Sequence, residues 1–135
     1  IAALAPNARS ATIFNLVSAL GRKDRAASLD LLDTLIREGE YLPLALTFLA
    51  TQFRLALVAK EEGLRSPQQI QAHFTRLGVP MWGSRAQQVY QTVAAFSQTK
   101  IELALMRIYQ ADKALRDARP DDRVVLEQFV TGLTA

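Results

Sequence analysis

Cysteine is absent from the 135 residues of the chain, and histidine occurs once. Without cysteine the chain forms no disulfide, no cysteine-ligated zinc site and no thiol nucleophile, and this composition fits a reducing compartment. His73 has no second histidine or cysteine with which to share a metal ion, so we expect it on the surface of a helix. The 6 glycines are dispersed and form no phosphate-binding loop. We therefore expect no metal and no cofactor.

Paired catalytic groups are also missing. The adjacent acidic pairs Glu61-Glu62 and Asp121-Asp122 stand near expected helix ends, where neighbouring side chains point in different directions. They are typical of solvated helix ends or caps rather than of a general acid and base. No serine stands in a context with histidine that suggests nucleophilic catalysis. The sequence therefore favours a binding or assembly role over an enzyme.

Blocks of like charge are absent too. The 16 basic and 13 acidic residues give a net charge of +3, and the two signs alternate along the chain. A nucleic-acid footprint needs clustered cations, which this pattern does not provide. A chain of this length suits one domain that buries about two thirds of its unfolded surface. It begins at Ile1 without methionine or a signal-like segment, which predicts a piece of a longer protein.

What the sequence does contain is apolar residues at helical spacing, without the alternation typical of strands. We expect an all-α protein, a single bundle of about seven helices over residues 10–135, preceded over residues 1–9 by a linker or the tail of another domain. The expected helices start at Ser10 or Thr12, after an Asp24 cap, at Leu42, after a Ser66 cap, at Ser84, at Ser97 or Thr99, and after a cap at Asp121 or Asp122. Their expected ends are Gly21, Gly39, Glu61, Gly78, Phe96, the segment 119–121 and the C-terminus. In the last helix the apolar series is Leu126, Phe129, Val130 and Leu133.

Two of these starts carry the signature of a capping box. Ser66 is followed by Pro67 at the first helical position and by Gln69 three residues on. Ser84 and Gln87 repeat the same spacing. Both serines are therefore expected to accept a hydrogen bond from the first turn of their helix.

The expected helix over residues 42–61 is the most apolar segment and carries two stripes. The first consists of Leu42, Leu46, Leu49, Phe53, Ala56 and Leu57. The second consists of Leu44, Phe48, Leu55 and Ala59. Pro43, Gln52 and Arg54 interrupt a run that barely reaches the roughly 20 residues of a membrane span, so we expect no membrane. Two interpretations remain open: a central helix buried on both faces, or a second face that receives a partner subunit.

The segment from Lys100 to Arg116 also has one apolar side, and we expect the bundle to be organised around it. The stripe consists of Ile101, Ala104, Leu105, Ile108, Ala111 and Leu115, with Tyr109 at its edge. Asp112 falls in the middle of this stripe, where an unpaired carboxylate would be costly. We expect Asp112 to make a structural polar contact, with an adjacent helix start or a nearby arginine, rather than to act in catalysis.

Residues 66–96 have the outline of a helix-turn-helix, with two capped helices joined through Gly78 and Pro80. This is the alternative function that the sequence offers, a DNA-binding domain. The second helix would present Arg85, Gln87, Gln88 and Gln91, with one arginine and no lysine, which is sparse for holding phosphates. We favour two ordinary packed helices.

The order of residues along the whole chain resembles one family. The matching positions are Phe14, Ala19-Leu20, Asp24, Ala27, Leu31-Leu32, Leu35, Gly39-Glu40, Pro43, Leu46, Leu49, Gln52-Phe53-Arg54-Leu55, Leu77-Gly78, Ala111-Asp112-Lys113-Ala114-Leu115 and Leu126-Glu127. In this joint order they resemble the C-terminal domain of the delta subunit of the bacterial DNA polymerase III clamp loader, over about residues 10 to 134. Where that family has a lysine and a small polar residue after the position of Leu115, this chain has Arg116-Asp117. Arg116 keeps the positive charge, but it cannot replace the lysine in a contact that requires a lysine side chain.

The resemblance implies a helical collar domain, which joins clamp-loader subunits into a ring for DNA replication in the bacterial cytoplasm. In the family, AAA+-like modules precede this domain and contact the sliding clamp, and the delta subunit opens the clamp without hydrolysing ATP. For this piece the resemblance implies no ATP site and no catalytic residue. Its partners would be the other clamp-loader subunits, with the clamp reached only through the preceding modules and DNA contacted weakly or indirectly. On this basis we expect Leu44, Phe48 and Leu55 near a subunit or interhelix interface.

Overall fold

The computed structural model describes residues 4–39, 41–117 and 122–135, and this part of the chain contains seven helices and no strand. The predicted all-α bundle is confirmed. The helices are α1 (Leu4–Gly21), α2 (Arg25–Arg37), α3 (Leu42–Glu61), α4 (Pro67–Arg76), α5 (Gly83–Ala95), α6 (Gln98–Asp117) and α7 (Asp122–Thr134).

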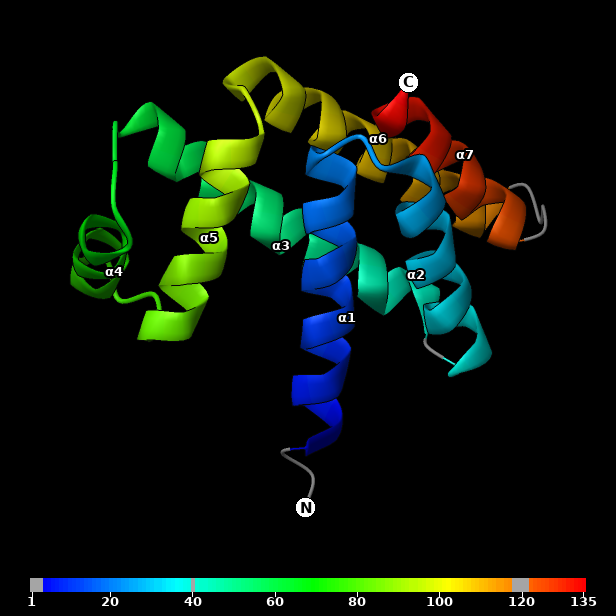
Figure 1. Ribbon diagram of the computed structural model, residues 1–135, viewed down its shortest axis with the longest axis horizontal. Helices are drawn as coiled ribbons and strands as arrows, with labels where there is room; N and C mark the ends of the chain where they lie inside the picture. Colours follow the sequence, from blue (N-terminus) through cyan, green and yellow to red (C-terminus); the bar gives the residue numbers. More distant parts are fainter. Residues whose placement is uncertain (1–3, 40, 118–121) are drawn as a thin grey trace.

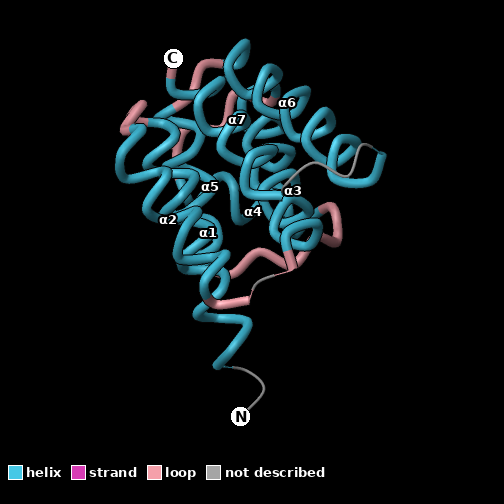
Figure 2. Tube along the Cα trace, turned by 90° about the vertical axis from the view of Figure 1, so that its right-hand side faces the viewer, coloured by secondary structure: helices cyan, strands magenta, loops and turns pink. Residues whose placement is uncertain are grey.

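Helix α3 crosses the middle of the bundle (Figure 1). It packs against α6 and α5 and also contacts α1, while α2 lies between α1 and α7, and α4 packs on α5. In the perpendicular view, α1 and α2 lie on one side and α3 and α6 on the other (Figure 2). Both views show the N-terminal end of α1 extending beyond the other helices. The sequence predicted that the bundle is organised around the helix that is now α6. In the structure α3 is as central as α6, because it packs against α6, α5 and α1.

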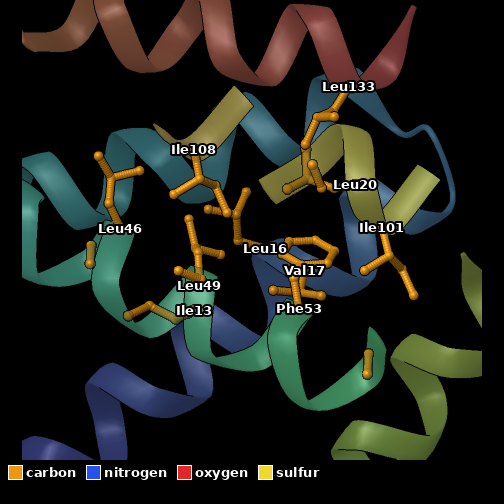
Figure 3. Packing of buried hydrophobic residues seen from close by; sticks show 14 of the residues in the cluster. Ile13, Leu16, Val17, Leu20, Leu46, Leu49, Phe53, Ile101, Ile108 and Leu133 are labelled. Carbon is orange, nitrogen blue, oxygen red and sulfur yellow. The ribbon is translucent and has the colours of Figure 1, made fainter. Parts of the chain in front are cut away.

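The core forms where the apolar stripes of these helices meet. Figure 3 shows side chains of α1, α3, α6 and α7 gathered there. Phe53, at the centre of α3, has no exposed surface. The predicted α6 positions Ile101, Ala104, Ile108 and Ala111 are buried, as are the predicted α7 positions Leu126, Phe129, Val130 and Leu133. Leu105 and Leu115 are only partly buried, and Tyr109 is 69% exposed, because the α6 stripe turns toward solvent on that side.

Helix α3 is long and apolar enough to cross a membrane by length and composition alone. Of its apolar 18-residue stretch, 44% is buried within the structure. Its packing accounts for this composition. The first stripe lies in the core, apart from the partly buried Leu57. Ala59 was predicted for the second stripe and is fully buried instead, because the C-terminal half of α3 runs beside α5. The second stripe therefore stays accessible only along the N-terminal half of α3.

Three predicted caps are present with side-chain hydrogen bonds. The Asp24 carboxylate accepts a bond of 3.1 Å from the Ala27 N–H at the start of α2. The Ser66 hydroxyl accepts a bond of 3.1 Å from the Gln69 N–H, and the Ser97 hydroxyl accepts one of 3.2 Å from the Lys100 N–H. The Gln69 side chain accepts from the Arg65 N–H at 2.7 Å, one residue earlier than in a standard capping box.

Two predicted boundaries are wrong, and one lies outside the described residues. Helix α1 begins at Leu4, not at Ser10 or Thr12, since Pro6 is tolerated in a first helical turn. Helix α5 begins at Gly83 with Trp82 at the cap and no side-chain cap bond, so Ser84 is inside the helix. The predicted end of the first helix is confirmed, since Gly21 is the last residue of α1, and a left-handed residue follows at Lys23, with φ 57°. The break predicted over residues 119–121 and the Asp121 cap lie outside the described residues, and α7 itself begins at Asp122.

Candidate protein-interaction surface

The accessible part of the second α3 stripe is the candidate site that the sequence pointed to. Leu44 is 36% exposed and Phe48 is 38% exposed, whereas Leu55 is partly buried against the core. Leu46 and Phe53, on the first stripe, are almost entirely buried. Burial of all three predicted interface residues deep in the core would have excluded a partner surface. Leu44 and Phe48 are exposed, so the geometry permits a partner surface here.

Phe48 opens onto a groove of about 390 Å³ between α1, α3 and α5. Each of the three helices contributes aromatic or apolar surface: Phe14 from α1, Phe48 from α3, and Trp82 from the start of α5. Trp82 is 57% exposed and so presents much of its ring to solvent. The remaining lining residues are Ala11, Ile13, Thr51, Gln52, Ser84, Arg85 and Gln88. We call this feature the aromatic groove.

Arg85 is held over the aromatic side of this groove. Its Nη1 donates a hydrogen bond of 2.8 Å to the Pro80 carbonyl, in the turn before α5. Its guanidinium carbon lies 5.3 Å from the centroid of the Trp82 ring, within the range of a cation–π contact. The two contacts fix a flexible side chain from two directions. The groove thus presents a positioned cation beside an exposed indole.

Two polar residues that line the groove, Gln52 and Gln88, are joined through Thr92. The Gln52 amide nitrogen of α3 donates to the Thr92 hydroxyl of α5 at 3.2 Å. The Thr92 hydroxyl donates in turn to the Gln88 carbonyl at 3.2 Å. Thr92 is buried, so these bonds remove the cost of a buried hydroxyl and tie the two helices in register.

A glycine sets the distance between α1 and α5. A β-carbon built on Gly21 would stand 2.9 Å from the Ala95 β-carbon and 2.9 Å from the Phe96 ring. Any larger residue would push the two helices apart at that end. Gly21 therefore both ends α1, as predicted, and allows the close approach of α1 to the end of α5.

Asp112 does not lie in the groove or in the core. Its side chain is 31% exposed, and its carboxylate pairs with Arg116 of the same helix at 3.1 Å. Both residues border a second hollow of about 270 Å³ between α3 and α6, together with Arg54 and Tyr109. Asp112 therefore has an arginine partner one helical turn away, at the edge of the apolar stripe rather than in its middle.

His73 lies on α4, partly exposed, with its ring 5.4 Å from the Phe74 ring in an edge-on arrangement. A search of the described residues finds no group of three or more histidine, cysteine or acidic side chains that could hold a metal ion. His73 and Asp112 lie on different helices, and no hollow described here is lined by both.

The helix-turn-helix outline corresponds to α4 and α5, which pack on each other. The face of α5 that carries Ala86, Val89 and Val93 is buried against the rest of the bundle, since α5 also contacts α3 and α1. Arg85, the sole arginine of α5, already donates a hydrogen bond to Pro80 and makes a cation–π contact with Trp82. Nothing in this arrangement favours DNA reading by α5.

The sequence pattern indicated Arg85 only as part of a possible DNA-reading helix and did not group it with Phe14, Phe48 or Trp82. The one local signal was the spacing of Trp82 and Arg85, three residues apart across a helix start, which permits a cation–π contact. The approach of Phe14 and Phe48 to this pair depends on how three helices pack, which no local pattern encodes.

Known proteins resemble this chain in sequence and in fold. The family model described as "DNA polymerase III delta subunit, C-terminal domain" matches residues 10–133. Among solved structures, the Bacillus subtilis DNA clamp loader delta protein (YqeN) is similar, with a TM-score of 0.77 and 22% sequence identity. The match covers 93% of this chain and 36% of that chain, so the chain spans about a third of the length of that relative. At this identity the likeness shows the fold. No curated protein sequence matches the chain.

Proposed function

The chain belongs to the family of DNA polymerase III delta subunits, whose C-terminal domain it carries, and we propose that it is the assembly (collar) domain of a clamp-loader delta subunit. The observation that carries this proposal is the family match over residues 10–133, nearly the whole of the chain. The resemblance read from the order of residues in the sequence is thereby confirmed. The all-α fold shared with the Bacillus subtilis clamp loader delta protein supports it.

The surface of the domain supports a docking role. Phe48 is exposed beside Leu44 and the aromatic groove, and neighbouring apolar groups exposed together mark protein-interaction sites. We propose that Leu44, Phe48 and Leu55 lie at or beside the contact with another clamp-loader subunit. Interfaces of this kind place aromatic anchors at their centre and polar groups at the rim.

The domain is proposed to act without catalysis. Its parent would be a non-hydrolysing subunit of the DNA polymerase III holoenzyme, working in the bacterial cytoplasm. Contact with the sliding clamp would belong to the modules that precede this domain in the family, and contact with DNA would be weak or indirect. The domain would then contribute the geometry of the ring rather than a chemical step.

Deletion of residues 10–135 from the full-length protein tests this function. We expect the truncated protein to lose co-elution with the motor subunits of its own clamp loader. Retention of binding to the sliding clamp is the matched control, because it shows that the remaining modules are folded. Co-elution of the truncated protein with the motor subunits at the level of the intact protein would contradict the proposal.

Titration of the 135-residue chain with duplex DNA at two salt concentrations tests the alternative. An assembly domain is expected to bind DNA weakly at both concentrations. A protein that neutralises several phosphates loses affinity steeply as salt rises. Tight, salt-sensitive binding would therefore favour the helix-turn-helix function for residues 66–96.

A further inference from the structure

The aromatic groove has an unbalanced charge. Arg85 is the one charged side chain among the described residues that line it, and none of these residues carries a carboxylate. The other polar groups there are neutral amides and hydroxyls, and the walls are aromatic and aliphatic. An apolar groove with a single fixed cation is complementary to a ligand that has an apolar side chain and one negative charge.

The geometry of Arg85 leaves part of its guanidinium available. Nη1 donates a hydrogen bond to the Pro80 carbonyl, and the guanidinium carbon lies 5.3 Å from the centroid of the Trp82 ring. In the part of the chain that the structure describes, no residue accepts a hydrogen bond from its Nε or Nη2. These two nitrogens lie on one side of the guanidinium, and a carboxylate can accept from both at once. Since the side chain is already held, little rotamer entropy remains to be lost on binding.

We propose that the aromatic groove binds an acidic, apolar-tipped segment of a partner clamp-loader subunit, with a carboxylate on Arg85 and an apolar side chain between Phe14 and Phe48. This inference rests on the proposed function and specifies the chemistry of the partner. The groove volume of about 390 Å³ is near the lower end of the ~300–1,000 Å³ of ligand clefts, which suits a few side chains.

The charge distribution favours a protein segment over nucleic acid. A phosphate backbone is held by several lysines and arginines, whereas this groove offers a single arginine among aromatic walls. A carboxylate next to an apolar residue matches both the single cation and the aromatic walls of the groove. Binding of nucleic acid here is therefore an outcome to be tested, not a second proposal.

Charge reversal at Arg85 tests the inference without threatening the fold. Arg85 lies in the first turn of α5, where a glutamate is favourable to the helix dipole. We expect full-length Arg85→Glu to bind the motor subunits at least about tenfold more weakly than the wild type, as for other interfacial charge contacts. Arg85→Lys keeps the charge but loses the planar fork, and is expected to weaken binding less. Thermal unfolding of each variant verifies that it is folded.

Arg76→Glu is the matched control, because Arg76 is an exposed residue of α4 that does not line the groove. We expect it to bind the motor subunits with wild-type affinity. Binding by Arg85→Glu within about twofold of the wild type, or an equal loss in Arg76→Glu, would overturn the inference. A fall in duplex DNA affinity for Arg85→Glu, with subunit binding unchanged, would likewise overturn it in favour of nucleic acid.

The two failures can be told apart. If deletion of residues 10–135 abolishes assembly while Arg85→Glu leaves it intact, the collar function stands and the partner chemistry is wrong. If the deletion leaves assembly intact, the collar function itself is wrong.

Discussion

The rings of Phe53 and Phe96 meet edge to face, with centroids 5.1 Å apart and an interplanar angle of 89°. Phe53 lies at the centre of α3, and Phe96 ends α5. The contact therefore joins the two helices that form two of the three walls of the aromatic groove. An edge-to-face pair depends on orientation as well as area, so it fixes how α5 leans on α3.

A double-mutant cycle with Phe53→Leu and Phe96→Leu measures this contact. Edge-to-face aromatic pairs contribute about 0.5–1.5 kcal/mol beyond their buried area. We expect a coupling free energy of that size in urea unfolding, since leucine fills most of the volume but has no ring edge. If the two single effects add within about 0.3 kcal/mol, the pair contributes only burial.

Gly21→Ala is expected to destabilise the protein because its β-carbon has no room. It would stand 2.9 Å from both Ala95 and Phe96, so the helices must shift, at a cost of about 1–3 kcal/mol. Gly83→Ala is the matched control, since a β-carbon there meets nothing within 4 Å. That change should leave the free energy of unfolding equal or raise it by up to about 1 kcal/mol. Equal effects of the two substitutions would rule out a close approach at Gly21.

The sequence predicted the elements whose signals are local. Helix α3 has its predicted bounds, Leu42 and Glu61, because Pro43 and an apolar run define it without outside help. The starts at Asp24 and Ser66 were found because their caps are hydrogen bonds within one turn. The start of α1 was missed, since residues 4–9 have no apolar period of their own.

The aromatic groove lay beyond sequence reasoning for a different physical reason. Its walls come from helices far apart in the chain, and their convergence depends on interhelical angles and on the close contact at Gly21. The α3 wheel placed Leu44, Phe48, Leu55 and Ala59 on one stripe, but only Leu44 and Phe48 are exposed, and Ala59 is buried. A helical wheel shows which residues share a face and leaves open which neighbour covers it.

Phe129→Ala should cost about 3–5 kcal/mol of unfolding free energy, because Phe129 of α7 is buried in the core. Val124→Ala on the same helix is the control. Val124 is exposed, so its truncation should change stability by less than about 0.5 kcal/mol. Urea denaturation of both variants measures the difference. A loss below about 1 kcal/mol for Phe129→Ala would mean that α7 packs on the surface rather than in the core.

Asp33 is expected to make stability depend on pH. Hydrogen bonds from Arg123 of α7, at 2.8 Å, and from Arg37 hold the pKa of Asp33 below its ordinary value of 3.8. A lowered native pKa means that the ion pairs stabilise the fold above the unfolded pKa, and that this contribution is lost as pH falls through the native pKa. Asp33→Asn should therefore lower the melting temperature at neutral pH, with a difference that shrinks below about pH 4.

Asp30→Asn is the comparison for Asp33, since Asp30 is an exposed carboxylate on the same helix. We expect its melting temperature to follow the wild type at every pH. A difference between Asp33→Asn and the wild type that stays constant from neutral pH to well below pH 4 would show that the carboxylate charge does not link α2 to α7.

The central claim is that the accessible face of α3 joins this domain to other clamp-loader subunits. The most direct test is the dissociation constant between the full-length protein and its motor subunits, measured for the wild type, for Phe48→Asp and for Met106→Asp, an equally drastic change at an exposed site on α6. We predict that Phe48→Asp weakens assembly by at least about tenfold and that Met106→Asp leaves it unchanged. Wild-type affinity in a folded Phe48→Asp protein would contradict the account.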